Sequence, residues 1–314
     1  MNKTLLLIDG HAMIHRAYHA LPDTMVSTDG IPTNAIYGFF MMLQKVLTEF
    51  KPSHLAVCFD TPKPTFRKEL FKEYQSKRPA METTLKVQIP EIKTLLTKGG
   101  VQCLEKPGFE ADDVIGTVAE KEKKEFNQVL ILTGDRDLLQ LADTNVYVIT
   151  PKKGVTEFTM YTPQEVENKF GVDPLRIPDY KALVGDSSDN YNTAKGIGPK
   201  SANKLLAQFP TVEELVNNID KIDNEKWRQI ITEYKETILL FKTIATIVRN
   251  VDVPFKKDEL SFTGFNDDMK TELRRLQLFS LLNKLFPQAA KEQPVKEPVK
   301  KKEEKTTDQI DMFS

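Results

Sequence analysis

The chain has 314 residues, 40% of them hydrophobic, and its 44 Lys and Arg residues nearly balance its 45 Asp and Glu residues. This composition is typical of a folded protein with one large domain or two smaller ones, and it excludes a uniformly basic protein that coats nucleic acid. No apolar run approaches the roughly 18 to 20 residues of a membrane span, and the N-terminal apolar stretch is too short for a signal peptide, so we expect a cytoplasmic protein.

Five short, apolar and β-branched runs in the first half of the chain indicate buried strands. The three strongest cover residues 4–9, 54–60 and 129–135, and two weaker ones cover residues 101–106 and 146–150. The two cysteines lie within these runs without metal or redox spacing, so we expect small buried side chains and no disulfide framework.

Segments with helical periodicity separate these strands, the clearest of them at residues 35–50 and 87–100. Alternating strands and helices are typical of a doubly wound α/β fold with a mostly parallel sheet. From about Gly171 onward the strand pattern ends, and helices broken by Gly and Pro turns follow. We therefore predict an α/β region over residues 1–170 and a helical region over residues 171–288.

Acidic residues gather at the predicted carboxyl ends of the strands, where open parallel sheets bind their ligands. Helix capping explains one or two of them, but six or seven carboxylates from separate segments repel one another in a dry interior unless cations are bound. Carboxylates without His or Cys suit Mg²⁺ or Mn²⁺, and two such ions about 4 Å apart support phosphodiester cleavage. The sequence therefore predicts a metal-dependent phosphoryl-transfer site. Its acids are Asp9, Asp60, Glu110, Asp112, Asp113, Asp135 and Asp137, joined by Asp186 and Asp189 from the second half.

A segment that is both basic and aromatic follows the second strand. Basic side chains bind the phosphates of single-stranded nucleic acid, and aromatic rings stack on its bases, so the combination suits a single-strand channel. A helix that only faces solvent would not need the aromatic rings. We predict that this segment contacts DNA. Its basic and aromatic side chains are Lys63, Phe66, Arg67, Lys68, Phe71, Lys72, Tyr74, Lys77 and Arg78.

The sequence GIGPKSANKLL in the second half indicates a tight hairpin that leads into a helix. Gly196 and Gly198 allow backbone N–H groups to approach a phosphate, and the helix N-terminus adds its dipole. The flanking residues Lys195, Lys200 and Lys204 favour a clamp on the DNA backbone. An ordinary helix–helix turn is the alternative.

Six motifs occur in the order found in a known family: LLLIDGHAMIHRAYHAL, FD followed by FR, GFEADDVIGT, LTGDRDLLQL, YKALVGDSSDN and GIGPKSANKLL. Over roughly residues 3–286 the chain resembles the 5′-nuclease domain of bacterial DNA polymerase I and its phage and flap-endonuclease relatives, in a free-standing form. The resemblance implies a PIN-like α/β nuclease domain with a helical arch at about residues 62–90. It also implies a helix–hairpin–helix (helix–three-turn–helix) module at residues 185–207. The implied activity is 5′–3′ exonuclease and flap endonuclease cleavage of flapped or nicked DNA, or of RNA primers, in replication and repair.

The resemblance also implies roles for single residues. Arg16 matches an Arg near the phosphate, Tyr74 matches the aromatic residue at the base of the arch, and Arg78 matches an arch Arg. Asp113 either joins the metal ligands or caps its helix, and the hairpin is a candidate potassium site. Two acid sets would each hold one of the two Mg²⁺ or Mn²⁺ ions. The first is Asp9, Asp60, Glu110 and Asp112, and the second is Asp135, Asp137, Asp186 and Asp189.

Two departures from the family pattern affect these expectations. The arch lysine of the family is Gln75 here, which removes a charge that stabilises the transition state, so Lys77 or Lys72 would have to substitute. The sequence DNYNTAKGIG lacks two prolines and a glycine of the family pattern, which loosens the hairpin. The alternative function is therefore a flap- or nick-binding protein that cuts poorly.

Two other interpretations rank lower. His11, His15 and His19 recur at helical spacing, but the family pattern carries His11 and His19 without a metal, which disfavours a zinc site. A phosphatase with Asp9 as nucleophile usually needs a second acid two residues later, where His11 stands.

The end of the chain has a different composition from the rest. Residues 289–308 are charged and nearly free of apolar side chains, which predicts a disordered linker. Residues 309–314 are similar to peptides that dock on the bacterial sliding clamp, and such a tether would raise the local concentration at DNA. The predicted anchor consists of Gln309, Ile310, Asp311, Met312 and Phe313.

Overall fold

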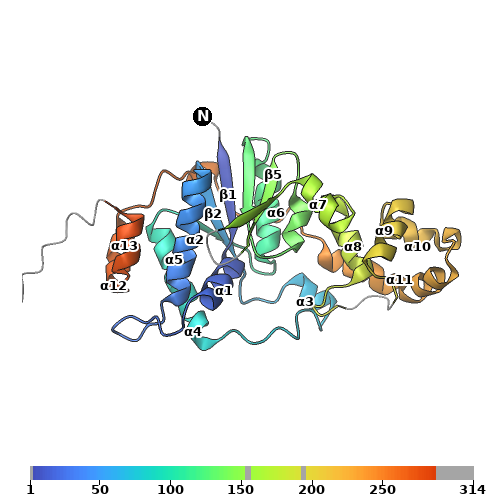
Figure 1. Cartoon of the computed structure of the whole chain (residues 1–314), viewed down its shortest axis with the longest axis horizontal. Helices are drawn as coiled ribbons and strands as arrows, with labels where there is room; N and C mark the ends of the chain where they lie inside the picture. Colours follow the sequence, from blue (N-terminus) through green and yellow to red (C-terminus); the bar gives the residue numbers. More distant parts are fainter. Residues whose placement is uncertain (1–2, 153–156, 192–195, 288–314) are drawn as a thin grey trace, which may run out of the picture.

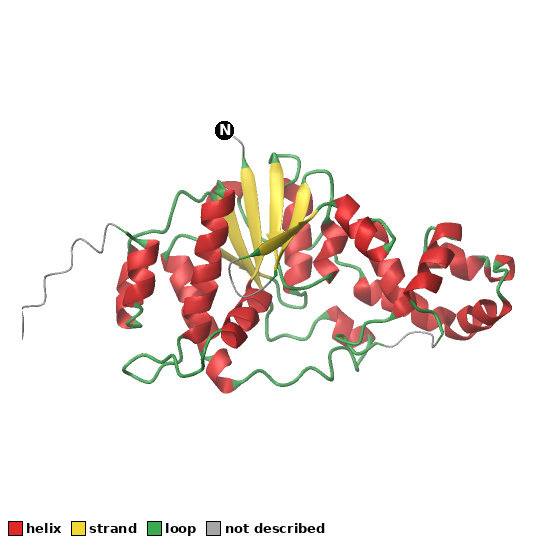
Figure 2. Ribbon diagram, viewed as in Figure 1, coloured by secondary structure: helices red, strands yellow, loops and turns green. Residues whose placement is uncertain are grey.

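A computed structural model describes residues 3–152, 157–191 and 196–287 of the chain. A six-stranded sheet in the order β3-β2-β1-β4-β5-β6 forms its centre (Figure 2). The five strands predicted from the sequence are present, and a sixth short strand adds to the edge. The strands are β1 (Thr4–Asp9), β2 (His54–Phe59), β3 (Gln102–Glu105), β4 (Gln128–Leu132), β5 (Val146–Pro151) and β6 (Phe158–Tyr161).

The pairing of the strands explains where a ligand site can form. Strands β1 to β5 pair in parallel, and β6 pairs antiparallel with β5. The chain runs from β1 outward to β2 and β3 and then crosses back to β4 on the other side of β1, so the strand order switches between β1 and β4. Crevices at such switch points are the usual ligand sites of open α/β sheets.

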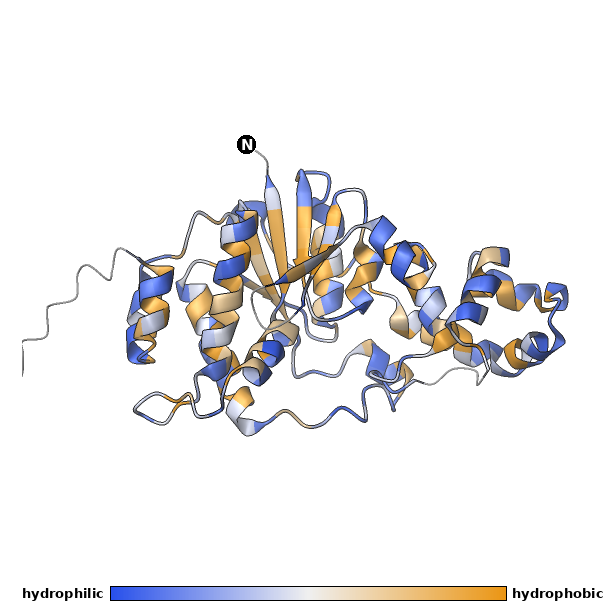
Figure 3. Ribbon diagram, in the orientation of Figure 1, coloured by the Kyte–Doolittle hydropathy of each residue, from blue (hydrophilic) through white to orange (hydrophobic). Residues whose placement is uncertain are grey.

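Helices cover both faces of the sheet (Figure 1). On one face, Leu6 and Ile8 of β1 pack in a cluster with residues of three helices, and on the other face Leu5 and Leu7 pack against a fourth helix. This alternation follows from the period of two along a strand. Figure 3 shows the strands as the apolar centre, with hydrophilic residues on the outer helices. The four helices are α1 (Gly10–Ala20), α2 (Asn34–Phe50) and α5 (Gln88–Lys98) on the first face and α6 (Ala111–Glu122) on the second.

The segment expected to form a helical arch differs from the prediction. Residues 62–90 contain only the short helices α3 (Phe66–Leu70) and α4 (Thr83–Lys86) and the start of α5, joined by turns and extended chain (Figure 2). Gln75 adopts a φ of 55°, which no right-handed helix can continue, and Pro79 disfavours helical geometry in the residue before it. The arch of this chain is therefore a largely irregular strap.

The helical region of the second half packs around its longest helix. α11 (Glu225–Ala245) lies against α8 (Ile177–Val184), and α8 in turn contacts α9 (Pro199–Gln208). Their buried side chains continue the cluster that lies under α6, so the region shares a core with the second face of the sheet. The remaining elements are α7 (Pro163–Phe170), α10 (Val212–Asn217), and the 3-10 helices η2 (Pro174–Arg176) and η3 (Ile219–Lys221).

The chain then returns to the sheet. After η4 (Lys257–Leu260), helices α12 (Asp268–Arg275) and α13 (Phe279–Leu285) pack against α5 and α2. Figure 1 places these two helices at the opposite end of the molecule from α9 and α10. The last helices of the predicted region 171–288 thus complete the core of the first face, because their apolar stripes are buried there.

Two further sequence predictions fall partly or wholly outside the described residues. Lys195 and the whole predicted linker and anchor, residues 289–314, are not described. Across the described ranges, no helix is both long and apolar enough to cross a membrane.

Candidate metal centre and nucleic-acid interface

Asp9, at the end of β1, is held by the first turn of α1 and by the residue that follows β4. Its Oδ1 accepts the N–H of Ala12 at 3.0 Å and caps α1, while its Oδ2 accepts the hydroxyl of Thr133 at 2.8 Å, directly after β4. Burial raises the pKa of Asp9 to about 6, and the charge of Asp60 adds to that rise. Thr133 was not singled out from the sequence, although it stands between β4 and Asp135.

Asp60 follows β2 and lies on the same edge of the sheet. Its Oδ1 accepts the N–H of Ala111 at 2.8 Å, which ties it to the start of α6. Burial opposes its ionisation, but the ring of His11, 3.2 Å from Oδ2, together with the Ala111 N–H and the charge of Arg78, outweighs burial and lowers the pKa of Asp60. His11 therefore partners an acid of the site.

Glu110 and Asp112 open α6 at this edge. The Tyr74 hydroxyl donates to Oε2 of Glu110 at 3.2 Å, and burial raises the pKa of Glu110 to about 7. Burial also raises the pKa of Asp112 well above its ordinary value, and the charges of Asp135 and Asp9 raise it further. The structure thus brings the first predicted set together, and we call Asp9, Asp60, Glu110 and Asp112 the sheet acids.

A second group of acids lies beside them. Carboxylate oxygens of Asp137, Asp186 and Asp189 lie within 4.8 Å of one another, and we call these three residues the turn acids. Asp137 begins the 3-10 helix η1 (Asp137–Leu141), and the other two lie in the turn after α8. Asp135 links the groups, because its Oδ1 accepts the N–H of Asp137 at 2.9 Å and its charge acts on Asp112.

Two cationic side chains enter the group of turn acids. Nζ of Lys181, on α8, forms an ion pair with Asp137 and lies 2.5 Å from Oδ2 of Asp186. Arg78 lies 2.6 Å from Oδ1 of Asp189. Burial alone would raise the pKa of Asp186, but Lys181, together with hydrogen bonds from the N–H and hydroxyl of Ser188, outweighs burial, and the pKa lies below its ordinary value. Lys181 was not predicted, although it lies in the motif YKALVGDSSDN.

Asp113 and Arg67 require a correction. Asp113 turns toward the Arg67 guanidinium, which donates hydrogen bonds to both of its carboxylate oxygens at 2.7 and 2.8 Å and also lies 3.5 Å from Oε2 of Glu110. It also closes a capping box at the start of α6, which was the predicted alternative. Arg67 is only 2% exposed and donates to the carbonyls of Ile244 and Thr246, so it is structural and does not face DNA.

The strap contacts the acids directly. Tyr74 is buried, and its hydroxyl lies 3.2 Å from Glu110 and 3.5 Å from Asp189, so it touches both acid groups. The Gln75 N–H donates to the carbonyl of Asp189 at 2.9 Å, which places position 75 beside the turn acids. Lys72 and Lys77 are exposed on the strap.

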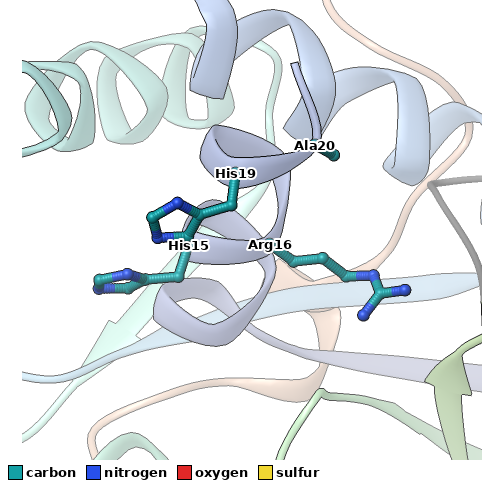
Figure 4. Close-up of a pocket in the computed structure, with 4 residues that line it drawn as sticks. All are labelled: His15, Arg16, His19 and Ala20. Carbon is teal, nitrogen blue, oxygen red and sulfur yellow. The ribbon is translucent and has the colours of Figure 1, made fainter. Parts of the chain in front are cut away.

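A surface pocket of about 380 Å³ opens on α1 (Figure 4). It is lined by His15, Arg16, His19 and Ala20, and the two histidine rings stack with centroids 6.4 Å apart. In Figure 4 the Arg16 side chain points away from the histidines, and its guanidinium donates to the carbonyl of Lys152 at 3.1 Å. Burial, followed by the charge of His11, lowers the pKa of His15.

The predicted hairpin leads into α9. Gly196 has a φ of 115°, a conformation that favours glycine, and no atom lies within 4 Å of a Cβ built at Gly198, which caps α9. Lys200 and Lys204 are exposed on that helix. This geometry leaves room for a ligand to approach the backbone at Gly198.

The residues of the acid site fit hard divalent cations. Oxygen-only ligand groups suit Mg²⁺ or Mn²⁺, and the presence of Lys181 among the turn acids shows that a positive charge is accommodated there.

Comparisons with known proteins agree with this geometry. The family models described as "5'-3' exonuclease, N-terminal resolvase-like domain" and "5'-3' exonuclease, C-terminal SAM fold" match residues 4–171 and 172–268. The 5'-3' exonuclease of Aquifex aeolicus is 39% identical over 292 residues, which are 92% of this chain and 98% of that protein.

DNA polymerase I of Bacillus caldotenax is 41% identical over 94% of this chain, but the chain spans only 34% of that protein's length. Among solved structures, the T5 5'-exonuclease with bound zinc has a TM-score of 0.65 at 18% identity, covering 88% of this chain and 99% of that one. The catalytic core of Rad2 with DNA substrate has a TM-score of 0.55 at 18% identity, covering 91% and 88%. These two structures share the fold, and the sequence matches decide the family: the chain belongs to the 5'-3' exonuclease family.

Proposed function

We propose that the protein is a structure-specific 5′ nuclease that hydrolyses phosphodiesters at flaps, nicks or RNA primers in DNA replication and repair. The observation that carries this proposal is the meeting of the sheet acids, Asp135 and the turn acids at the switch point of the sheet. Two divalent ions held there, Mg²⁺ or Mn²⁺, would supply an activated water and charge stabilisation at the leaving oxygen.

Residues of the chain would hold the ions and place the strand. The sheet acids would bind one ion, and Asp135 with the turn acids would bind the other. Arg78 is half-exposed and lies against Asp189, so its guanidinium is within reach of a phosphate that enters the site. Tyr74 orients Glu110 by its hydrogen bond, and Arg16 would meet a phosphate near α1.

The remaining basic surface suits the DNA on either side of the cut. The exposed Lys72 and Lys77 on the strap would meet single-stranded DNA, as single-strand channels do. On the duplex side, Lys200, Lys204 and the backbone at Gly198 would clamp phosphates, and the hairpin that begins at Gly196 is the candidate potassium site.

A flap- or nick-binding protein with weak catalysis is the second candidate function. The observation that favours it is the position of Gln75, whose backbone N–H donates to the carbonyl of Asp189 at 2.9 Å. A lysine at this position would bring a positive charge next to the turn acids, and this chain lacks it. The nuclease is favoured because the sheet acids, Asp135 and the turn acids all lie at this site, and of the predicted ligands only Asp113 is engaged elsewhere.

The proposal also includes a protein partner and a location in the cell. We propose that Gln309 to Phe313 dock on the bacterial sliding clamp, on the strength of their likeness to clamp-binding peptides, although they lie outside the described residues. A cytoplasmic location at the nucleoid follows from DNA as substrate.

The test uses a 5′-labelled flap duplex and Mg²⁺, with cleavage and binding measured separately. We expect wild-type protein to cut near the junction and Asp135→Ala to bind the flap without cutting it. Asp252→Ala is the matched control, because the Asp252 side chain is 98% exposed and its ion pair within the described residues is with Lys106, which lies outside the acid site. A wild type that binds tightly and leaves the flap intact with every divalent metal would overturn the nuclease and support the binding protein.

A further inference from the structure

Lys181 has a position that neither the fold nor the proposed reaction requires. Its side chain is 11% exposed and extends from α8 into the turn acids, where Nζ pairs with Asp137 and lies 2.5 Å from Asp186. Those carboxylates belong to the group whose oxygens lie within 4.8 Å of one another. An ammonium thus stands among the oxygens proposed to hold a divalent ion.

Electrostatics explains why an ammonium is stable there. Side chains of Asp137 and Asp186 are 13% and 14% exposed, so their negative charges are poorly screened by water. Buried carboxylates without a counter-charge are strongly destabilising. Lys181 supplies one positive charge to two acids, while Arg78 neutralises Asp189 from the strap side.

The same position sets up a competition. A divalent ion bound by Asp137 and Asp186 would take the oxygens that Lys181 now contacts, and two positive charges cannot share that space at low energy. Lysine suits such an exchange better than arginine does, because its ammonium is a point charge on a flexible stem. The Lys181 side chain can therefore rotate away from the turn acids without unfolding α8.

We propose that Lys181 is a resident counter-ion that a divalent cation displaces from the turn acids, so that it sets the affinity of the second metal. The inference rests on the proposed function, because it takes the turn acids to be metal ligands. Lys181 acts through those acids and is a positioning residue. It offsets one of the three negative charges of the turn acids when no metal is bound, and it weakens binding of the second ion because its ion pairs with Asp137 and Asp186 must break.

Mn²⁺ binding in the absence of DNA tests this inference, with free Mn²⁺ measured by electron paramagnetic resonance. Lys181→Met keeps the apolar stem and removes the charge, so we expect the weaker of two sites to tighten about tenfold or more. Lys181→Arg keeps the charge and should not tighten the site. Lys235→Met, which removes an exposed lysine of α11, is the matched control and should behave as wild type.

The outcomes separate this inference from the proposed function. Wild type with two sites, of which Asp186→Asn removes one, combined with unchanged or weaker Mn²⁺ binding in Lys181→Met, would overturn the inference and leave the metal centre standing. Wild type without Mn²⁺ binding would overturn the metal centre and the inference together.

A second measurement uses the wild-type protein, in case Lys181→Met does not fold without metal. The ¹⁵Nζ resonance of Lys181, assigned by its loss in Lys181→Arg, should be protected from hydrogen exchange without metal and lose that protection as Mg²⁺ fills the second site. Protection that persists at saturating Mg²⁺ would show that Lys181 stays in place and is not displaced.

Discussion

The sheet acids and the turn acids lie side by side but are neutralised in different ways. The sheet acids are held by backbone N–H groups and hydroxyls, and burial raises the pKa of Asp9 to about 6 and of Glu110 to about 7. The turn acids also pair with the cations Lys181 and Arg78, and Lys181, together with the N–H and hydroxyl of Ser188, holds the pKa of Asp186 below its ordinary value. Without metal, the raised pKa values let Asp9 and Glu110 take up protons near pH 6 to 7, while the lowered pKa of Asp60 keeps that carboxylate ionised. Lys181 and Arg78 offset part of the charge of the turn acids.

This difference shows two ways in which buried acids can be stabilised when no metal ion is bound: proton uptake and pairing with side-chain cations. Protons leave the sheet acids as the pH rises, so metal binding there should depend on pH. The turn acids exchange one cation for another, so metal binding there should depend on Lys181 and on ionic strength. The two groups should therefore respond to different changes.

The largest expected effect is the loss of cleavage when either group of acids loses one ligand. A loss for only one of the two groups would contradict the proposal that both groups bind a metal ion. Asp112→Asn, in the sheet acids, and Asp186→Asn, in the turn acids, should each lower the single-turnover rate of flap cleavage by about 10³-fold, or about 4 kcal/mol. Both losses are expected because the proposed reaction needs an ion at each group. A rate within tenfold of wild type for either variant would show that its group is dispensable, and Asp252→Ala serves as the control.

A second test separates Asp113 from the sheet acids. Arg67→Met leaves the buried Asp113 carboxylate without its guanidinium and should lower the free energy of unfolding by about 3 kcal/mol, measured by urea titration in EDTA. Arg67→Met combined with Asp113→Leu should recover part of that loss and leave Mn²⁺ binding at the wild-type level. Loss of a Mn²⁺ site in the double variant would return Asp113 to the metal ligands.

The third test follows from the pKa of Asp9. Its folded-state pKa of about 6 lies above the ordinary value of 3.8, so the folded protein holds this proton more tightly than the unfolded chain does. The stabilising contribution is complete below about pH 4 and is lost as the pH rises through 6. In EDTA, Asp9→Asn should therefore be about 3 kcal/mol more stable than wild type at pH 8 and nearly equal to it at pH 4. Equal differences at both pH values, by urea unfolding, would contradict this assignment.

The smallest expected effect concerns the strap. Gln75→Lys places an ammonium next to Asp189, where it can stabilise charge on a phosphate, and should raise the cleavage rate by about tenfold, or about 1.4 kcal/mol. Gln164→Lys on α7, an exposed position, controls for the added charge. A Gln75→Lys rate equal to that of wild type would mean that Arg78 already supplies the charge this step needs.

The structure gathers the acids predicted for the proposed metal site at one edge of the sheet and pairs Asp113 with Arg67 instead. Asp9, Asp60 and Asp135 could be predicted because each follows an apolar run, and parallel strands bring their carboxyl ends to one edge. Asp113 could not be separated from Asp112 by sequence, because adjacent residues on a helix point about 100° apart and only packing tells which direction is buried. The strap was wrongly expected to be helical, since its charged and aromatic pattern does not reveal the φ of 55° at Gln75.

The sequence by itself determined five of the six strands, their order of alternation with helices, and the acids at the strand ends, because these depend on local periodicity and on chain direction. Only the tertiary structure decided which charges meet. Arg67 pairs with Asp113 across 46 residues of sequence, and Lys181 on α8 reaches Asp137 on η1. It also decided that α12 and α13 return to cover α5 and α2. Such partners depend on how separate elements pack, and no local pattern encodes that choice.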